Sequence, residues 1–556
     1  MRVAYVLPIA LCLAPFASQP ITPGGPPADL ILHHARIYTL SESHPVAEAL
    51  AIGKGRFVAV GTRADVLRWN GRSTEMIDAG GATVVPGLQD AHGHVLSLGK
   101  PLRELDLRDT PTFEAIVERV RARAATMGPG EWVLGRGWDQ NRWPIKEWPA
   151  AGPLDIAAPK NPVFLTRIDG HAALASRLAL EAGGVGRETP DPAGGRIVRD
   201  AAGTPTGVLV DRAQALVARH IPAPSRDQLI EQLVLADRDM RRVGLTMVHD
   251  AGVEPAVVEL YRELVAAGRI ATRVYVMLTG LDVGDWFRRG PLLDPHHRLT
   301  VRAIKLVADG ALGSRGAALF EDYADELGVR GLLVTPPDRL YVAARAASAA
   351  GFQTAVHAIG DRANREVLDM FERIERELPA ARGLRPRVEH AQILDRADIP
   401  RLARLGVIAS VQTTHCTSDM PWAPRRLGEA RVAEGAYVWR KLIDAGALLA
   451  QGSDFPVERP DPLLGFYAAI TRQDTNGQPP LGWAADQRLT REEALRAMTL
   501  GAAYAAHAEH DLGSIEPGKL ADFVVLSRDI MQVEPRDVLS TAIVRTVVGG
   551  RTVYRQ

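Results

Sequence analysis

Cysteine is nearly absent from this chain of 556 residues. Its two cysteines, Cys12 and Cys416, cannot form a disulfide framework, and neither belongs to a CxxC pair, so a disulfide scaffold and dithiol redox chemistry are excluded. An excess of one charge is also absent. The 66 Lys and Arg residues balance 66 Asp and Glu residues, so no nucleic-acid-binding surface is expected. Only 5% of the residues are aromatic but 46% are hydrophobic, which is typical of a soluble globular protein rich in small apolar side chains.

Long hydrophobic runs are confined to the first 25 residues. That segment has one arginine, an apolar run from Val3 to Ala17 and an end rich in proline and glycine, as secretory signal peptides do. The run is too short for a membrane span. We therefore predict a signal peptide over residues 1–25, a periplasmic or secreted location, and a mature chain without a membrane span. A disordered leader is one alternative; a lipoprotein anchor at Cys12 is another, weakened by Leu11 where a small residue is expected.

The two ends of the remaining chain share a β-rich pattern. Short runs with strand-forming residues occur over 29–40, 49–61, 520–526 and 543–554. Neither end has enough strands for a stable core, because an isolated hairpin is marginal in water. We therefore predict that residues 29–82 and 510–556 combine into one small β-sandwich.

Between these ends, apolar strands alternate with amphipathic helices. Capping boxes start two of the helices, one at Ser225 with Gln228 and one at Thr490 with Glu493. Strands are predicted over 245–250, 302–307, 353–358, 386–391, 407–412 and 448–454. This alternation indicates a parallel sheet, and the number of units favours closure. The predicted fold is α/β, a (β/α)8 TIM-type barrel over residues 83–505 with the β-sandwich at its flank.

The start of the barrel leaves alternatives open. The first strand is predicted over 83–92, and the second is either 132–137 or 162–167. A doubly wound open sheet is the competing architecture. However, no GxGxxG motif or P-loop follows a predicted strand to support it.

Polar residues close the predicted barrel strands. They are His92, His94, Lys305, His357, His390 and Asp454. Active sites of such barrels lie at the carboxyl ends of the strands, so we expect these side chains to meet. His92 and His94 are two positions apart, which lets both point the same way from an extended segment and bind one ion. Buried polar groups must each be satisfied, and a metal would satisfy this set.

Lys305 is the exception, because an ammonium group among metal ligands would repel a cation. One interpretation is an ion pair with the nearby Asp309. The other is a lysine whose uncharged amine has reacted with carbon dioxide to form a carbamate, whose two oxygens can bridge two ions. Burial among cations favours the uncharged amine that this reaction needs.

Further motifs accompany these six residues. They are GRGWDQNRW (135–143), RIDGHAALAS (167–176), PDPAGGRIVRDAAGTPTGV (190–208), TMVHDAG (246–252) and KLVADGALGSRGA (305–317). Together the motifs resemble the amidohydrolase superfamily, and within it the amidohydrolase family 3 branch, which includes formamide deformylases. The resemblance runs from about residue 29 to the C-terminus. It implies a metal-dependent barrel hydrolase with a flanking β-sandwich and an insertion, over about 100–210, that covers the barrel mouth.

The resemblance also implies roles for the strand-end residues. His92, His94 and Asp454 would hold one metal and His357 and His390 a second, with carboxylated Lys305 as the bridge. The expected cofactor is Zn²⁺, as one ion or two, with another divalent metal as the alternative.

The predicted reaction is hydrolysis of a carbon–nitrogen bond in a small-molecule amide or N-formyl compound, not a peptide, by a metal-activated hydroxide. Asp454 is expected to take a proton from the water and return it to the leaving nitrogen, and Lys305 is the second predicted catalytic residue. Candidates for substrate contacts or oxyanion stabilisation are His171, His249, Arg315 and His415, each with a plain structural role as the alternative.

Several alternatives remain at this point. Trp132, Trp138, Trp143 and Trp148 indicate either an aromatic substrate or, as we favour, packing of the insertion onto the barrel. One barrel site supports several reactions, so an esterase or isomerase of the same superfamily competes with the amide hydrolase. A non-catalytic scaffold and an extracytoplasmic solute-binding protein are further alternatives. The sequence indicates no partner other than a small-molecule substrate. The expectation of a homodimer rests only on the high frequency of dimers among proteins.

Overall fold

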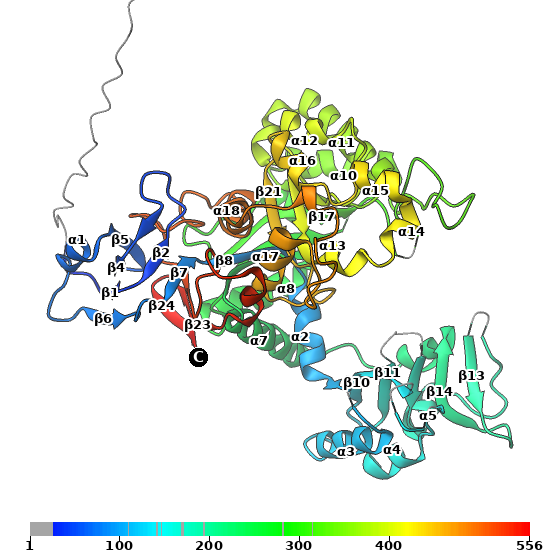
Figure 1. Cartoon of the computed structure of the whole chain (residues 1–556). Coiled ribbons are helices and arrows are strands. Elements are labelled where there is room, and N and C mark those ends of the chain that lie inside the picture. The colour runs from blue at the N-terminus through cyan, green and yellow to red at the C-terminus, as the bar shows by residue number, and fades with distance from the viewer. Residues whose placement is uncertain are drawn as a thin grey trace, which may run out of the picture.

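The computed structural model describes residues 26–108, 110–140, 143–145, 147–167, 172–192, 195–280, 283–313 and 315–556 (Figure 1). Its centre is an eight-stranded parallel sheet that curls into a nearly closed barrel, which confirms the predicted fold class. In sheet order the strands are β8 (Leu88–Gly93), β15 (Leu245–Val253), β16 (Arg273–Thr279), β17 (Leu299–Val307), β18 (Gln353–Ala358), β19 (Arg387–His390), β20 (Ile408–Gln412) and β21 (Leu449–Gly452). The predicted signal peptide lies outside the described residues.

Helices alternate with these strands. They include α2 (Val95–Arg103), α7 (Arg226–Arg242), α8 (Pro255–Ala266), α9 (Asp285–Arg289), α10 (Pro337–Ala349), α11 (Asp361–Glu377), α12 (Ile399–Leu405), α13 (Thr413–Asp419), α14 (Ala423–Leu427), α15 (Glu429–Gly435), α16 (Trp439–Asp444), α17 (Pro462–Thr471), α18 (Arg491–Arg496) and α19 (Ala502–Ala505). Both predicted capping boxes are present, at Ser225 before α7 and at Thr490 before α18. Among the described residues, no helix combines the length and the apolar character that a membrane crossing requires.

The predicted first strand is in fact two strands in two different sheets. β7 (Thr83–Pro86) belongs to the sandwich and β8 to the barrel. Gly87 separates them at a crowded point, where a Cβ atom would lie 2.4 Å from Oγ1 of Thr246 and 2.9 Å from Cβ of Asp522. The change of sheet was missed because a continuous apolar run does not reveal which neighbours the strand will pair with.

The prediction of the second barrel strand was wrong. Neither 132–137 nor 162–167 lies in the barrel, and β15 pairs directly with β8. The third strand, β16, had no predicted counterpart. The two mistaken runs are β10 (Val133–Trp138) and β11 (Val163–Arg167), which pair with each other in a sheet of the inserted segment. Their strand character was therefore predicted, but a local pattern could not tell the two sheets apart.

Side-chain and backbone hydrogen bonds link the first and last barrel strands. The backbone N–H of Asp454 donates to the carbonyl of His92 at 2.7 Å. The buried carboxylate of Asp90 accepts from the hydroxyl of Ser453 at 2.5 Å and from the backbone N–H groups of Ser453 and His92. Burial raises the pKa of Asp90 to about 7. This seam puts His92 beside Asp454.

Both ends of the described chain build the flanking sandwich. One sheet contains β1 (Leu30–His33), β4 (Ala49–Gly53), β5 (Arg56–Gly61) and β6 (Glu75–Asp78). The other contains β2 (Arg36–Tyr38), β3 (Val46–Ala47), β7, β22 (Phe523–Leu526), β23 (Ile543–Val548) and β24 (Arg551–Arg555). β22 pairs with β7 antiparallel, and Leu32, Phe57, Val84, Phe523 and Val547 pack in one core. The predicted joint sandwich is thus confirmed.

The inserted segment forms a separate lobe with its own sheet. This sheet contains β9 (Leu105–Asp106), β10, β11, β12 (Ala172–Ala175), β13 (Gly195–Arg199) and β14 (Pro205–Asp211). Its helices are α3 (Phe113–Ala124), α4 (Gly152–Ala157), α5 (Arg177–Ala182) and α6 (Ala215–Ala218). Figure 1 shows the lobe beyond α2, apart from the barrel, and a cleft of about 820 Å³ lies between it and helices α2 and α7. That the lobe covers the barrel mouth stays a prediction.

The tryptophan cluster belongs to the core of this lobe. Trp138 and Trp143 are buried with stacked rings 6.1 Å apart, and their indole N–H groups donate to the carbonyls of Leu165 and Thr110. Trp148 meets Trp138 edge-on and is partly exposed. These three tryptophans therefore stabilise the lobe itself rather than fasten it to the barrel, whereas Trp132 packs on a second core of the lobe and lines the cleft that faces α2 and α7.

Candidate metal centre

The predicted strand-end residues meet at the carboxyl end of the barrel. Oδ1 of Asp454 lies 3.1 Å from Nε2 of His94 and 3.7 Å from Nε2 of His92. Nζ of Lys305 lies 3.2 Å from the same Nε2 of His92. The ring of His390 is 5.0 Å from that of His92. Residues from β8, β17, β19 and the segment after β21 therefore form one cluster.

Hydrogen bonds at Nδ1 orient the first two imidazoles. Nδ1 of His92 lies 2.5 Å from Oε2 of Glu389, and Nδ1 of His94 lies 2.8 Å from the carbonyl oxygen of Ala251. A carboxylate and a carbonyl can only accept, so each Nδ1 carries the proton and each Nε2 keeps its lone pair. Both Nε2 atoms face Asp454.

The other two imidazoles, His390 and His357, lie next to each other. Nδ1 of His390 lies 2.7 Å from Oε1 of Gln412, which leaves its Nε2 available as a ligand. The ring of His357 lies 4.5 Å from that of His390. Nε2 of His357 is buried, has no hydrogen-bond partner among the described residues, and lies 3.6 Å from Oδ1 of Asp309. His357 thus joins the cluster from β18.

The protonation states fit a divalent cation. Burial and the charge of Lys305 lower the pKa of His92 to about 4 and that of His357 to about 3, so both are neutral at neutral pH. Burial alone would raise the pKa of Asp454, but the contact with His94 and the charges of His92, His390 and His415 together outweigh burial and hold the pKa far below the usual range. Two Nε2 lone pairs facing an ionised carboxylate repel unless a cation or a proton lies between them. Neutral imidazoles with a carboxylate are a donor set that Zn²⁺ prefers.

Lys305 is buried beside His92 rather than paired with Asp309. Burial lowers the pKa of Lys305 to about 8, which raises the fraction of uncharged amine at neutral pH. The carboxylate of Asp309 instead accepts backbone N–H groups at 2.8 to 3.0 Å, those of Ala318, Ile359 and Gly360. The ion-pair interpretation of Lys305 was therefore wrong.

The backbone is strained where two of the ligand strands end. His390, Ala391 and Asp454 have φ values of 78°, 41° and 59°, in the left-handed region that residues with a Cβ atom rarely adopt. The bend at His390 lets consecutive residues, Glu389 and His390, both approach His92. Such strain is typical of functional sites.

The predicted substrate contacts His415 and His249 lie in different surroundings. His415, on α13, places Nε2 3.8 Å from Oδ2 of Asp454, and its ring stacks 6.0 Å from that of His390. Its ligand atom is within 4.8 Å of those of His390 and Asp454, so His415 belongs to a second candidate metal-binding group beside the group of His92, His94 and Asp454. His249 is fully buried inside the barrel, where its Nδ1 accepts from Arg387 at 2.9 Å.

The remaining two predicted contacts differ from these. Arg315 lies in the loop after β17, where its guanidinium binds Asp325 at 3.0 and 3.2 Å and Glu326 at 3.0 Å. A substrate contact would require these ion pairs to open. His171 lies outside the described residues, so its predicted role is not examined by the structure.

Sequence reasoning missed the residues that orient the ligands. Glu389 and Gln412 each bind a ligand imidazole, and Asp90 links the strands that carry His92 and Asp454. One signal was present: Arg387 and Glu389 alternate in a short buried strand, so both face the barrel interior. Two opposite charges in an interior are unusual enough to mark a functional region.

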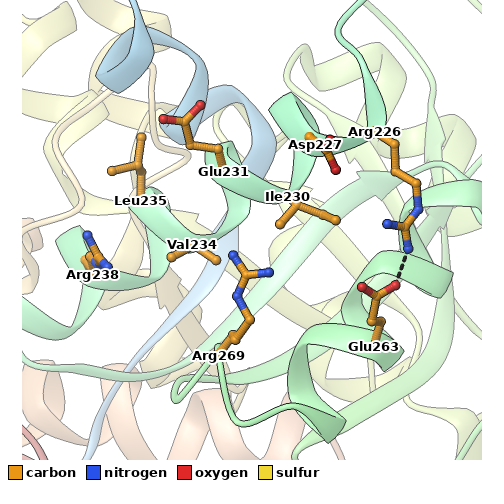
Figure 2. A pocket seen from close by; sticks show the side chains of 9 residues that line it. All are labelled: Arg226, Asp227, Ile230, Glu231, Val234, Leu235, Arg238, Glu263 and Arg269. Carbon is orange, nitrogen blue, oxygen red and sulfur yellow. Dashed lines mark hydrogen bonds and ion pairs between the residues drawn. The ribbon is translucent and has the colours of Figure 1, made fainter.

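A surface pocket of about 500 Å³ on the outside of the barrel contains none of the predicted residues. Figure 2 shows it between α7 and α8, with Arg226 paired to Glu263 across one end. Apolar residues, three arginines and three acidic residues line it: Arg226, Asp227, Ile230, Glu231, Val234, Leu235, Arg238, Glu263 and Arg269. The balanced, largely exposed charges do not form a buried donor set like that of the barrel mouth.

Known proteins resemble this chain over nearly its whole length. Residues 75–554 match the Amidohydrolase family. The chain is 36% identical over 554 residues to Protein LONG AFTER FAR-RED 3 of Arabidopsis thaliana, covering 96% of this chain and 92% of that protein. It is 29% identical over 548 residues to N-substituted formamide deformylase of Arthrobacter pascens, covering 95% and 98%. The solved structure of an uncharacterized metal-dependent hydrolase from Pyrococcus furiosus is similar with a TM-score of 0.75 at 29% identity, covering 90% of this chain and 100% of that one.

Proposed function

The chain belongs to the amidohydrolase family of metal-dependent enzymes, and from this membership we propose that it hydrolyses a carbon–nitrogen bond outside peptides, in a small amide or N-formyl compound. The observation that carries the proposal is the convergence of Nε2 of His92 and of His94 on the carboxylate of Asp454. His357, His390 and Lys305 complete the proposed metal ligands. Support for the N-formyl class comes from the relative that is named a formamide deformylase.

The metal we propose is Zn²⁺, as one ion or two. A zinc ion in such a site acidifies bound water at neutral pH and polarises a carbonyl group. Asp454 is proposed to accept the proton of the attacking water at a carboxylate oxygen and to return it to the leaving nitrogen. Its low pKa keeps the carboxylate ionised at neutral pH.

Lys305 is proposed to be carboxylated. The uncharged amine attacks carbon dioxide, a nitrogen–carbon bond forms as one carbon–oxygen π bond opens, and one amine proton leaves to the solvent, so that a carbamate anion replaces the amine. The lowered pKa of Lys305 supports this step because it increases the supply of uncharged amine. The carbamate would then lie beside His92, in place of an ammonium group whose positive charge opposes metal binding.

Four residues are proposed substrate contacts. His415 has the strongest support, because its Nε2 lies 3.8 Å from Asp454 and has no hydrogen-bond partner among the described residues. Arg315 could contribute only after leaving Asp325 and Glu326. For His171 and His249 the support is the sequence pattern alone.

Elemental analysis combined with a substrate panel tests the proposal. Purified protein and the Lys305→Ala variant are assayed for metal per chain, and both are given N-formyl amines, other amides and esters. We expect about two zinc ions per chain, fewer in the variant, and turnover of amides or formamides. One ion in both proteins would overturn the bridging role of Lys305. Turnover of esters alone would mean that the enzyme is an esterase rather than an amidase. Absence of bound metal would refute the proposal of a metal-dependent hydrolase.

A periplasmic or secreted location is also a proposal, as is a homodimer. The location rests on the leader-like residues 1–25. N-terminal sequencing of the protein recovered outside the cytoplasm should show cleavage near the end of that segment. An intact Met1 on a cytoplasmic protein would contradict it.

A further inference from the structure

A buried ion pair lies directly beneath the proposed metal ligands. Arg387 and Glu389 alternate along β19, and both side chains are wholly inaccessible to solvent. Nε of Arg387 is 2.7 Å from Oε1 of Glu389, and its Nη2 is 3.1 Å from Oε2. The same Oε2 atom lies 2.5 Å from Nδ1 of His92. A chain of contacts therefore runs from Arg387 through Glu389 to a proposed metal ligand.

Arg387 is also bound from three other barrel strands. Its Nη2 donates to the carbonyl of Ala91 on β8 at 2.7 Å and to Oγ of Ser410 on β20 at 2.9 Å. Its Nη1 donates to Nδ1 of His249 on β15 at 2.9 Å. These bonds hold the guanidinium in one place, and the guanidinium in turn holds the carboxylate of Glu389.

We propose that Glu389 and Arg387 are positioning residues for the metal centre. Glu389 keeps the proton of His92 on Nδ1 and fixes the plane of the ring, so that the Nε2 lone pair faces the site. Arg387 holds the carboxylate of Glu389 in place. This inference rests on the proposed function, since it requires a cation at His92.

Stability alone does not explain this ion pair. Burying two charges costs free energy that their attraction only partly returns, and well-packed apolar replacements are often equally stable. Partners of ligand imidazoles, in contrast, typically contribute about 10–100-fold to metal affinity. The contact with His92 is therefore the reason we assign for keeping the pair.

Two double variants isolate that contact. Arg387→Met with Glu389→Gln and Arg387→Met with Glu389→Leu both remove the buried charges at similar volume. Only the glutamine version retains an oxygen that can accept from Nδ1 of His92. A matched control is Arg273→Met with Asp522→Leu, because Arg273 and Asp522 also form a buried pair, at 2.7 and 2.8 Å, but contact no proposed ligand.

The measurements are zinc affinity by chelator competition, the thermal midpoint of the metal-free proteins, and the visible spectrum of the cobalt-loaded forms. We expect the leucine variant to lose about 10–100-fold in affinity with an altered cobalt spectrum, and the glutamine variant to lose clearly less. The control variant should keep wild-type affinity and spectrum. Equal affinity losses in the leucine and glutamine variants, or none in either, would overturn the positioning role.

A fallback variant and the wild type separate the remaining outcomes. If the leucine variant does not fold, Glu389→Asp keeps the charge but withdraws the acceptor from His92. Weaker zinc binding by Glu389→Asp supports the inference, and unchanged binding overturns it. A wild-type protein that binds no metal overturns both the proposed function and the inference, whereas normal binding in every variant overturns the inference alone.

Discussion

Two buried arginine–carboxylate pairs lie at opposite ends of the barrel. Arg387 and Glu389 lie below the metal centre and contact His92, whereas Arg273 starts β16 and binds Asp522, next to the sandwich strand β22. Asp522 also accepts the backbone N–H of Gly549, which ties the sandwich to the barrel floor. The chemistry of the pairs is alike and the burial is alike. The two pairs differ in their neighbours. Glu389 contacts a proposed metal ligand, whereas Asp522 links the barrel to the sandwich.

The largest expected effect is on turnover, from a change at the carboxyl end of the barrel strands. Asp454→Asn removes the proposed proton acceptor, so the turnover number should fall about 10²–10⁴-fold. The thermal midpoint of the metal-free protein should remain close to that of the wild type, because asparagine has nearly the same size and its amide N–H can donate to an imidazole Nε2 lone pair. Steady-state kinetics and calorimetry check both parts. Activity within threefold of wild type would contradict the proposed role.

A change at the amino end of the barrel strands should lower stability but leave activity unchanged. Arg273→Ala leaves the buried Asp522 without its partner, which typically costs about 3–5 kcal/mol in the free energy of unfolding. Zinc affinity and turnover of the folded protein should be unchanged. Urea denaturation measures the first and chelator competition the second. If Arg273→Ala lowers both zinc affinity and the free energy of unfolding, the metal site depends on the packing at the opposite end of the barrel.

A change at the barrel seam should affect both properties. In Gly452→Ala, the added Cβ would lie 2.4 Å from the backbone nitrogen of His92, so β21 and β8 must move apart. Overpacking of this kind costs about 1–3 kcal/mol. We also expect weaker zinc binding, because His92 and Asp454 are held together across this seam. Gly61→Ala, where no atom lies within 4 Å of the added Cβ, is the control. A lower free energy of unfolding with unchanged zinc affinity would show that the contact between β21 and β8 does not determine the geometry of the metal site.

The smallest expected effect is a pH dependence at the amino end. Burial and the nearby Arg302 and Arg385 lower the pKa of His507 to about 4, although a hydrogen bond to the carbonyl of Leu384 and the charge of Glu509 oppose the shift. The folded-state pKa lies below the unfolded value, so the contribution of His507 is complete above pH 6.5 and is lost as the pH falls toward 4.

His507→Asn tests this contribution, because asparagine tolerates the positive φ of 56° at this position. Unfolding free energies of the wild type and the variant are compared at pH 7 and pH 5. The wild type should lose more stability over that interval than the variant does. Equal losses would show that other groups account for the pH dependence.

Prediction from the sequence succeeded where local pattern and chain direction suffice. The positions of His92, Lys305, His357 and His390 near the carboxyl ends of their strands follow from the alternation of short strands with helices along the chain. It failed where two segments had to be told apart by their partners. The runs that became β10 and β11 have the composition of barrel strands, and the change of sheet at Gly87 depends on Thr246 and Asp522.

The sequence by itself determined the kinds of donor at the site, because four histidines, a lysine and an aspartate end strands that a parallel barrel brings to one face. Only the tertiary structure decided which nitrogen of His92, His94 and His390 is available. That choice depends on an acceptor at Nδ1, and for His92 the acceptor is Glu389, a residue 297 positions away along the chain. The tautomer and the ring plane are thus properties of packed strands rather than of any local motif.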